Sequence, residues 1–193
     1  MDTLLSILLC VILVAAVLRV AFGIAYFRVY IVGSSMSSTL IGAPNKDSRG
    51  GDYVYAFRSS NPKRGDIVVI DTKTNTNKTI IKRVIALGGD TVELKEGVLY
   101  LNGEVVDEPY VSDKNNTPSE NSYAQIVVPE GTMFCLGDNR DVSVDSRSET
   151  YGCMPVSWTA GVVADWSMSL KGAVTAFNCF IDFTLPEMFG GKK

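Results

Sequence analysis

An apolar run over residues 4–27 constrains this chain more than any other feature of its sequence. As a helix rising about 1.5 Å per residue, the run can cross a hydrocarbon core of about 30 Å. A cleavable signal peptide and a buried core helix are the alternatives. Residues 1–3 contain no lysine or arginine, and no Ala-x-Ala site closes the run, which is unlike a cleavable signal peptide. We therefore predict an uncleaved membrane anchor over residues 1–28.

Two arginines, Arg19 and Arg28, lie toward the C-terminal end of this anchor. A charge at bilayer depth costs at least about 2.5 kcal/mol, but Arg19 is close enough to the end of the run to extend its guanidinium to the interface. Because positive charge marks the cytoplasmic side, these two residues alone would place the following domain in the cytoplasm.

After residue 30 the hydrophobic pattern changes to the alternation that is typical of strands. Asn102 and Gly103 form a strong hairpin signal, because this pair tolerates the positive φ angles of a type I′ turn. No amphipathic helix is predicted in this part of the chain. Short strands are predicted at residues 66–70, 79–87, 91–94, 98–101, 124–128 and 132–136, with turn-rich stretches between them.

This pattern predicts a mainly β fold, an antiparallel β-sheet domain over residues 29–170 behind one N-terminal transmembrane helix. Residues 91–128 are predicted to form a small inserted β subdomain or hairpin extension. An apolar C-terminal tail follows over residues 171–193. Together with Trp158 and Trp166, this tail is expected either to rest on the lipid surface or to cover the β core.

Composition excludes several other classes of protein. At 193 residues, the chain can form one ordinary core but not two full-sized domains. The net charge is −3 and no basic stripe follows residue 30, so no nucleic-acid partner is predicted. No metal site and no cofactor is predicted. Cys135 and Cys153 flank a charged loop and could pair in an oxidising compartment, a question that sequence leaves open.

The chain contains no histidine, which limits how a serine could act as a nucleophile. A Ser-His-Asp triad is impossible, so the base must be a carboxylate or a lysine made basic by desolvation. Ser35 lies in a flexible, hydroxyl-rich segment just behind the anchor and follows Gly33. Glycine and serine are also ordinary in linkers, so this segment alone is weak evidence for a nucleophile.

Lys82 and Arg83 lie next to each other in the strand predicted at residues 79–87. Both faces of that strand are apolar, so alternation does not show which cation is buried. Arginine stays protonated and cannot serve as a base, whereas the pKa of a buried lysine can fall from about 10.4 toward about 7–8. The alternative is that both cations keep a sheet edge soluble.

The charged loop, residues 137–147, carries dense acidic and basic residues next to an apolar strand. Such a loop can form an internal ion-pair network or a solvated turn. Its order of residues resembles one sequence box of the bacterial-type type I signal peptidases, the membrane-anchored Ser/Lys proteases that release exported proteins from their signal sequences. The four boxes that carry this resemblance, in chain order, are residues 35–40, 64–69, 81–90 and 137–147.

The resemblance implies a role for each matching residue. Ser35 is similar to the nucleophile of the family and Lys82 to its general base. Ser143 resembles the serine that hydrogen-bonds and orients the lysine. The remaining residues implied by the resemblance are Asp145, which organises the site, its partner Arg147, and Asp138 and Arg140 as structural members of the loop.

Two positions depart from the family pattern. Ser38 stands where the family usually has proline, which removes rigidity but no catalytic group. Gly33 stands where many members have a serine whose hydroxyl contributes to the oxyanion hole. The resemblance then implies that the oxyanion depends on the N–H of Ser35, with the backbone of Gly33 as a second candidate donor.

The resemblance further implies that the substrates are signal peptides of exported preproteins, with small residues at the first and third positions before the cut. The catalytic domain would lie on the extracytoplasmic side of the cytoplasmic membrane, despite Arg28. The lipid bilayer and, by proximity, the secretion machinery would be its partners.

Two other functions fit parts of this sequence. A self-cleaving repressor-type protease also uses a Ser/Lys pair, but the anchor and the lack of a DNA-binding half argue against it. A non-enzymatic membrane-anchored β module would leave Lys82 without a catalytic role, and the intact charged loop argues against it.

Overall fold

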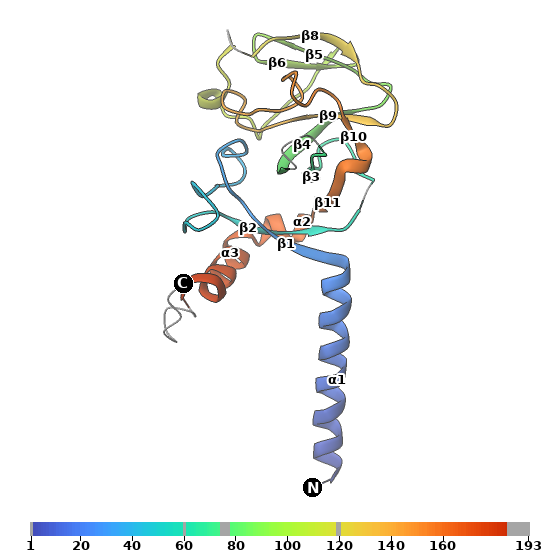
Figure 1. Ribbon diagram of the computed structural model, residues 1–193, viewed down its shortest axis with the longest axis vertical. Coiled ribbons are helices and arrows are strands. Elements are labelled where there is room, and N and C mark those ends of the chain that lie inside the picture. The colour runs from blue at the N-terminus through green and yellow to red at the C-terminus, as the bar shows by residue number, and fades with distance from the viewer. Residues whose placement is uncertain (1, 60, 74–77, 119–120, 185–193) are drawn as a thin grey trace.

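The computed structural model describes residues 2–59, 61–73, 78–118 and 121–184. Helix α1 (Asp2–Ala25) projects from one end of a β domain (Figure 1). Within the described residues one helix, over Thr3–Ala25, is long and apolar enough to cross a membrane, and its apolar window is not buried inside the protein. The predicted N-terminal transmembrane helix is therefore compatible with the structure.

The β domain contains two antiparallel sheets, as the alternation of the sequence predicted. The larger sheet has seven strands in the order β1-β2-β11-β3-β4-β9-β10: β1 (Tyr26–Tyr30), β2 (Tyr53–Phe57), β11 (Thr159–Val163), β3 (Ile67–Asp71), β4 (Thr79–Leu87), β9 (Thr132–Leu136) and β10 (Met154–Pro155). The smaller sheet has four strands in the order β7-β6-β5-β8: β7 (Glu104–Val105), β6 (Val98–Leu101), β5 (Thr91–Lys95) and β8 (Tyr123–Val127).

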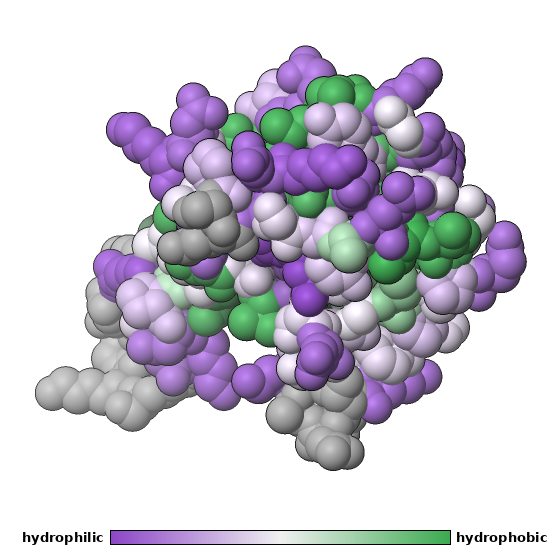
Figure 2. Space-filling model, turned by 90° about the horizontal axis from the view of Figure 1, so that it is seen from above, coloured by the Kyte–Doolittle hydropathy of each residue, from purple (hydrophilic) through white to green (hydrophobic). Residues whose placement is uncertain are grey.

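The smaller sheet lies at the end of the molecule opposite α1 (Figure 1). A view onto that end shows mostly hydrophilic side chains around the outline, with hydrophobic residues in separate groups (Figure 2). The short 3-10 helices Asp113–Asn115 and Val156–Trp158 lie in connections between strands.

Sequence reasoning missed several elements of the fold. The anchor helix ends at Ala25 rather than at residue 28, because Tyr26–Tyr30 pairs with β2 as strand β1. The prediction that no amphipathic helix follows residue 30 is wrong. Helices α2 (Asp165–Ser169) and α3 (Lys171–Cys179) and a π-helical turn (Phe180–Thr184) follow β11.

Helices α2 and α3 complete the hydrogen bonding of β2. Strand β11 pairs with β2 only near Phe57, so the rest of that edge of β2 has no strand beside it. The amide of Tyr53 donates to Oγ1 of Thr175 at 2.8 Å, and the amide of Tyr55 donates to Oγ of Ser167 at 2.6 Å. Helix α3 is amphipathic in sequence but only nine residues long, and sequence reasoning overlooked it.

The core of the larger sheet holds the segment that follows β1. Met36 and Leu40 are almost fully buried and pack with residues of β2, β3 and β11. These two side chains fix the position of Ser35, which lies just before Met36. Cys135 and Cys153 are both free thiols in this structure, so the disulfide that the sequence allowed is not formed.

Candidate active site

Ser35 and Lys82 meet at the centre of the candidate site. Lys82 lies on β4 opposite Val68 of β3, and only 3% of its surface is exposed. Its Nζ lies 2.8 Å from Oγ of Ser35 and donates a second hydrogen bond, 3.0 Å long, to the carbonyl of Ile81. The predicted nucleophile and base are therefore within proton-transfer distance of each other.

Burial makes Lys82 a weaker base than an exposed lysine. Desolvation by the surrounding protein is the main cause that lowers the pKa of Lys82 from 10.5 to about 8. The negative charge of Asp145 opposes this change and raises the pKa of Lys82. A lysine with such a pKa has a substantial neutral fraction near physiological pH, and only the neutral amine can accept a proton.

Arg83, the second cation whose position the strand pattern left open, points away from the nucleophile and binds the charged loop. Its guanidinium forms two hydrogen bonds to the carboxylate of Asp138, at 2.9 and 2.7 Å, and lies over the ring of Tyr110 at 3.9 Å from the centroid. Asp138 is 1% exposed, so the pair is largely removed from water. Of the two neighbouring cations, Lys82 faces the nucleophile and Arg83 holds the charged loop.

The charged loop is also hydrogen-bonded to the nucleophile segment, residues 33–40, through Asn139. The amide of Asn139 donates to the carbonyl of Ser35 at 3.0 Å. The side-chain amide of Asn139 donates to the carbonyl of Ser34 at 3.1 Å and to Oγ of Ser37 at 2.8 Å. Sequence reasoning did not single out Asn139, although it lies inside the matching loop box.

Asp145 and Arg147 organise the interior of the loop. Oδ2 of Asp145, which is fully buried, accepts the amide of Gly137 at 3.0 Å. Arg147 donates to both carboxylate oxygens of Asp145, at 2.9 and 3.0 Å, and to the carbonyl of Arg140 at 2.7 Å. The loop is an internal network rather than a solvated turn.

Arg140 forms the outer part of the same network. Its buried side chain donates to both carboxylate oxygens of Glu108, at 3.0 and 2.5 Å. Glu108 was not predicted as part of the site. It precedes the small 3-10 helix in a stretch with no strand signal, so the sequence gives no indication of this contact.

Ser143 differs from its predicted role. Its Oγ is buried and has no hydrogen-bond partner among the described residues, so the bond to Lys82 implied by the resemblance is not formed here. A Cβ added at Gly137 would lie 2.3 Å from Oγ of Ser143 and 2.4 Å from the carbonyl oxygen of Ser35. Ser143 therefore lies against the same glycine as the nucleophile backbone.

The backbone of Gly33 is already used by the fold. Its φ of +84° suits glycine, and its amide donates to the carbonyl of Ala43 at 2.9 Å. The amide of Ser35 has no acceptor among the described residues. Of the two candidate oxyanion donors, the Ser35 N–H is the one free to bind a ligand in this structure.

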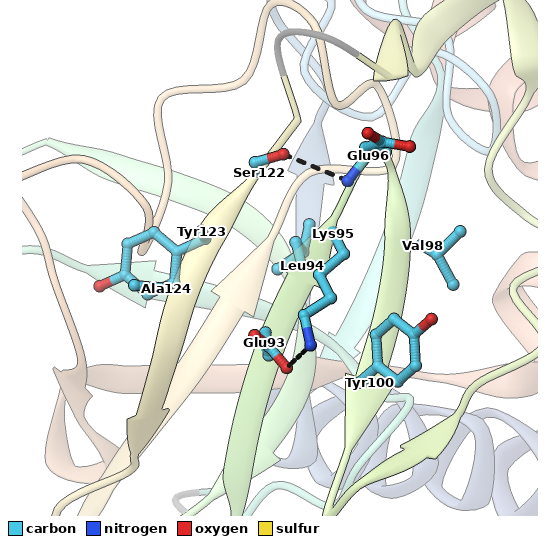
Figure 3. A pocket seen from close by; sticks show the side chains of 9 residues that line it. All are labelled: Glu93, Leu94, Lys95, Glu96, Val98, Tyr100, Ser122, Tyr123 and Ala124. Atoms are coloured by element: carbon cyan, nitrogen blue, oxygen red, sulfur yellow. Dashed lines mark hydrogen bonds and ion pairs between the residues drawn. The ribbon is translucent and has the colours of Figure 1, made fainter.

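Several hollows lie outside this centre, among them one of about 400 Å³ against the charged loop, lined in part by Arg140, Ser143 and Arg147. Another of about 170 Å³ lies beside the nucleophile segment and is lined by Thr39, Gly65, Asp66, Ile67, Arg83, Val163, Asp165 and Met168. A broader one of about 700 Å³ lies on the smaller sheet around an ion pair of Lys95 with Glu93 at 2.9 Å (Figure 3). None of the residues lining the broader hollow belongs to the predicted site.

Comparisons with known proteins decide the family. Residues 1–166 match the family model of the signal peptidases, peptidase S26. The chain belongs to the signal peptidase family. A signal peptidase I from Bacillus licheniformis is 36% identical over 148 residues, which cover 71% of this chain and 75% of the relative. Signal peptidase I T from Bacillus subtilis (strain 168) is 36% identical over 149 residues, covering 71% and 72%.

A solved signal peptidase I from Enterococcus faecalis V583 is also similar, at 33% identity and a TM-score of 0.46, covering 54% of this chain and 97% of that one. Membership of the signal peptidase family makes this chain a serine endopeptidase of that family and confirms the predicted family and enzyme class. The family match ends at residue 166, so α3 lies beyond it.

Proposed function

We propose that this protein removes signal peptides from exported preproteins at a membrane surface, with Ser35 as the nucleophile and Lys82 as the general base. The observation that carries the proposal is the 2.8 Å contact between Nζ of Lys82 and Oγ of Ser35 in a buried setting. The names of the similar proteins support the same substrate class.

In the first step, neutral Lys82 accepts the hydroxyl proton of Ser35 while Oγ attacks the scissile carbonyl carbon. The lysine then gives that proton to the amine that leaves, and an acyl-enzyme ester on Ser35 remains. Water attacks the ester, and Lys82 takes one of its protons and returns it to Ser35. The cleaved signal peptide departs as a carboxylic acid, which releases its proton to the solvent. No other base is required for the cycle to balance.

The free amide of Ser35 supports a role as oxyanion donor, since it moves with the nucleophile and needs no rearrangement. An extended peptide docked over Lys82 would exclude water, which favours the neutral amine and hence the active form. Asp138, Arg140, Asp145 and Arg147 would act by holding the loop against the nucleophile segment. Ser143 would act beside them as a supporting residue.

For the orientation, we propose that the N-terminus is cytoplasmic and that the β domain lies on the extracytoplasmic side. Arg28 argues against this by the positive-inside rule. In the folded domain, however, Arg28 donates to Asn178 at 3.0 Å and to Asp182 at 3.1 Å, which gives its charge a structural role. Protease protection of the β domain in sealed membrane vesicles of known orientation tests this proposal.

The central experiment incubates the detergent-solubilised full chain with a preprotein. We expect Ser35→Ala and Lys82→Ala to lose cleavage by a factor on the order of 10³ or more. Lys95→Ala and Ser157→Ala, at exposed positions on the β domain, serve as matched controls and should cleave as the unchanged protein does.

Cleavage by Lys82→Ala at the unchanged rate would refute the role of Lys82. Cleavage of only its own chain would favour the repressor-type protease. No cleavage by any variant or by the unchanged protein, with the preprotein cut by a known signal peptidase, would favour a non-enzymatic β module.

A further inference from the structure

The C-terminal stretch 165–184, which contains α2, α3 and the π-helical turn, buries several polar side chains and exposes several large apolar ones, although Asp165 and Ser169 of α2 are also exposed. Ser167 and Asn178 are 0% and 3% exposed and hydrogen-bond within the protein. The exposed apolar set consists of Leu170 (56% exposed), Phe177 (64%), Phe180 (44%) and Ile181 (38%). A surface helix in water normally shows the opposite arrangement, so this exposed apolar set fits an apolar environment.

The exposed apolar set extends along the C-terminal stretch. Leu170 caps α3 at its N-terminus, Phe177 lies within α3 and Ile181 lies in the π-helical turn that follows, so exposed apolar side chains recur along the stretch from residue 170 to residue 181. The two charged residues between positions 170 and 184 are both paired with the β domain. Lys171 contacts Asp52 at 3.2 Å, and Asp182 contacts Arg28 at 3.1 Å.

Helix α2 packs against the C-terminal end of α1 through aromatic rings. The ring of Trp166, in α2, lies 6.1 Å from the ring of Phe22 and 5.8 Å from that of Tyr26, centroid to centroid. It also stacks on Tyr55 at 5.6 Å. In Figure 1, α2 and α3 lie at the end of the β domain from which α1 projects. Tryptophan and tyrosine favour the boundary between hydrocarbon and water, so this aromatic cluster marks the level at which α1 leaves the bilayer.

We propose that α2 and α3 lie in the interface of the membrane that α1 crosses and form a second attachment of the β domain to lipid. Lipid fits the exposed apolar set better than a soluble partner, because both charges between positions 170 and 184 are paired and the set adjoins the membrane helix through Trp166. Since both charges between positions 170 and 184 are paired, apolar insertion, rather than attraction to anionic headgroups, holds the stretch there.

Helix α3 is also hydrogen-bonded to the nucleophile segment. Nζ of Lys171, the first residue of α3, donates to the carbonyl of Thr39 at 2.8 Å. One anchor would leave the domain free to tilt about the end of α1. A second contact at α3 fixes the height of Ser35 above the bilayer, where a membrane-inserted peptide must present its cleavage site.

The test places one new tryptophan at a time in the full chain, reconstituted into neutral phosphatidylcholine vesicles that carry bromine, a short-range quencher, on the lipid acyl chains. Phe177→Trp is the test variant, and Ile181→Trp repeats it within the exposed apolar set. Val127→Trp, on the smaller sheet and also 64% exposed, is the matched negative control. Leu9→Trp, within α1, is the positive control. The signal of Trp158 and Trp166 in the unchanged protein is subtracted.

We expect bromine near the headgroups to quench the added fluorescence of Phe177→Trp and Ile181→Trp at least twofold, while Val127→Trp is unaffected. Leu9→Trp should be quenched by bromine deep in the chains. If Leu9→Trp is quenched but both variants of the exposed apolar set behave like Val127→Trp, the proposal is wrong, and a protein partner or a second copy covers this set. An unquenched Leu9→Trp would overturn it as well, because α1 would not be inserted. None of these readouts depends on peptide cleavage.

Discussion

Nζ of Lys82 lies 2.8 Å from Oγ of Ser35, across a separation of 47 residues in the chain. Strand β4 brings the lysine to this point and the buried side chains of Met36 and Leu40 bring the serine. The same burial that positions the amine also lowers its pKa, so the geometry of the pair and the neutral form of the base have one origin.

The first prediction concerns pH. Because burial lowers the pKa of Lys82 to about 8 and only the neutral amine is a base, kcat/KM for preprotein cleavage should rise with pH and reach half its plateau near pH 8. A docked peptide adds desolvation, so the acid limb of kcat should lie at lower pH than that of kcat/KM. Steady-state rates from pH 6 to about pH 10 measure both limbs. Profiles that stay flat over this range would contradict a lysine base.

The second prediction concerns stability. The pKa of Lys82 is about 8 in the folded protein and 10.5 for an ordinary lysine, the value expected in the unfolded chain. Between these two values the unfolded chain binds more protons, so stability rises with pH. Below pH 8, Lys82 is charged in the folded protein, and its desolvation lowers the free energy of unfolding by the full amount. Lys82→Met should therefore increase the free energy of unfolding at pH 7 by about 1–3 kcal/mol.

Thermal or denaturant unfolding in detergent checks this increase, with Lys95→Met as the exposed control, which should change little. The advantage of Lys82→Met should shrink as the pH approaches 10.5. A variant that is less stable than the unchanged protein at pH 7 would show that the hydrogen bonds of Lys82 outweigh its desolvation.

The sequence predicts those parts of this structure that depend on local pattern. Alternation predicts β4 and β9 with their observed bounds, since each has apolar residues that face a core. It does not predict that Lys82 faces Ser35 and Arg83 faces Asp138, because both faces of β4 are covered and only the partners, distant in sequence, decide.

Helix α3 shows the other limit of pattern reasoning. In this helix Asn178 is buried against the protein and Phe177 is 64% exposed, which is the reverse of the arrangement that the rule assumes. The contact of Arg140 with Glu108 could not be predicted from the sequence either, because it joins two loops that are distant in the chain. The resemblance of the loop box identified Asp145 and Arg147. Only the structure shows that the buried hydroxyl of Ser143 has no hydrogen-bond partner among the described residues.

The third prediction concerns Gly137. An added Cβ would lie 2.4 Å from the carbonyl oxygen of Ser35 and 2.3 Å from Oγ of Ser143, so one of them must move. Gly137→Ala should lower kcat on the order of 10²-fold through displacement of the nucleophile and cost about 1–3 kcal/mol of stability. Gly172→Ala, where an added Cβ meets nothing within 4 Å, is the control. Unchanged kcat in Gly137→Ala would show that the loop can shift without moving Ser35.

The last prediction concerns Lys171, which lies outside the family match. Its Nζ donates to the carbonyl of Thr39 at 2.8 Å and contacts Oδ2 of Asp52 at 3.2 Å, and that same oxygen accepts the amide of Ile41 at 2.7 Å. Lys171 thus holds both ends of the turn that leaves the nucleophile segment. Lys171→Met removes these contacts but keeps the side-chain length.

We expect Lys171→Met to lower kcat about 3- to 10-fold, equivalent to about 1 kcal/mol, with little change in KM, because Thr39 lies beyond the reacting atoms but is covalently continuous with them. Lys171→Arg should recover most of the loss, since it retains the charge and the donors. Steady-state cleavage in detergent gives kcat and KM separately, and the melting temperature measures the structural contribution. If kcat falls only in proportion to the folded fraction, or if arginine fails to restore it, Lys171 stabilises α3 without positioning Ser35.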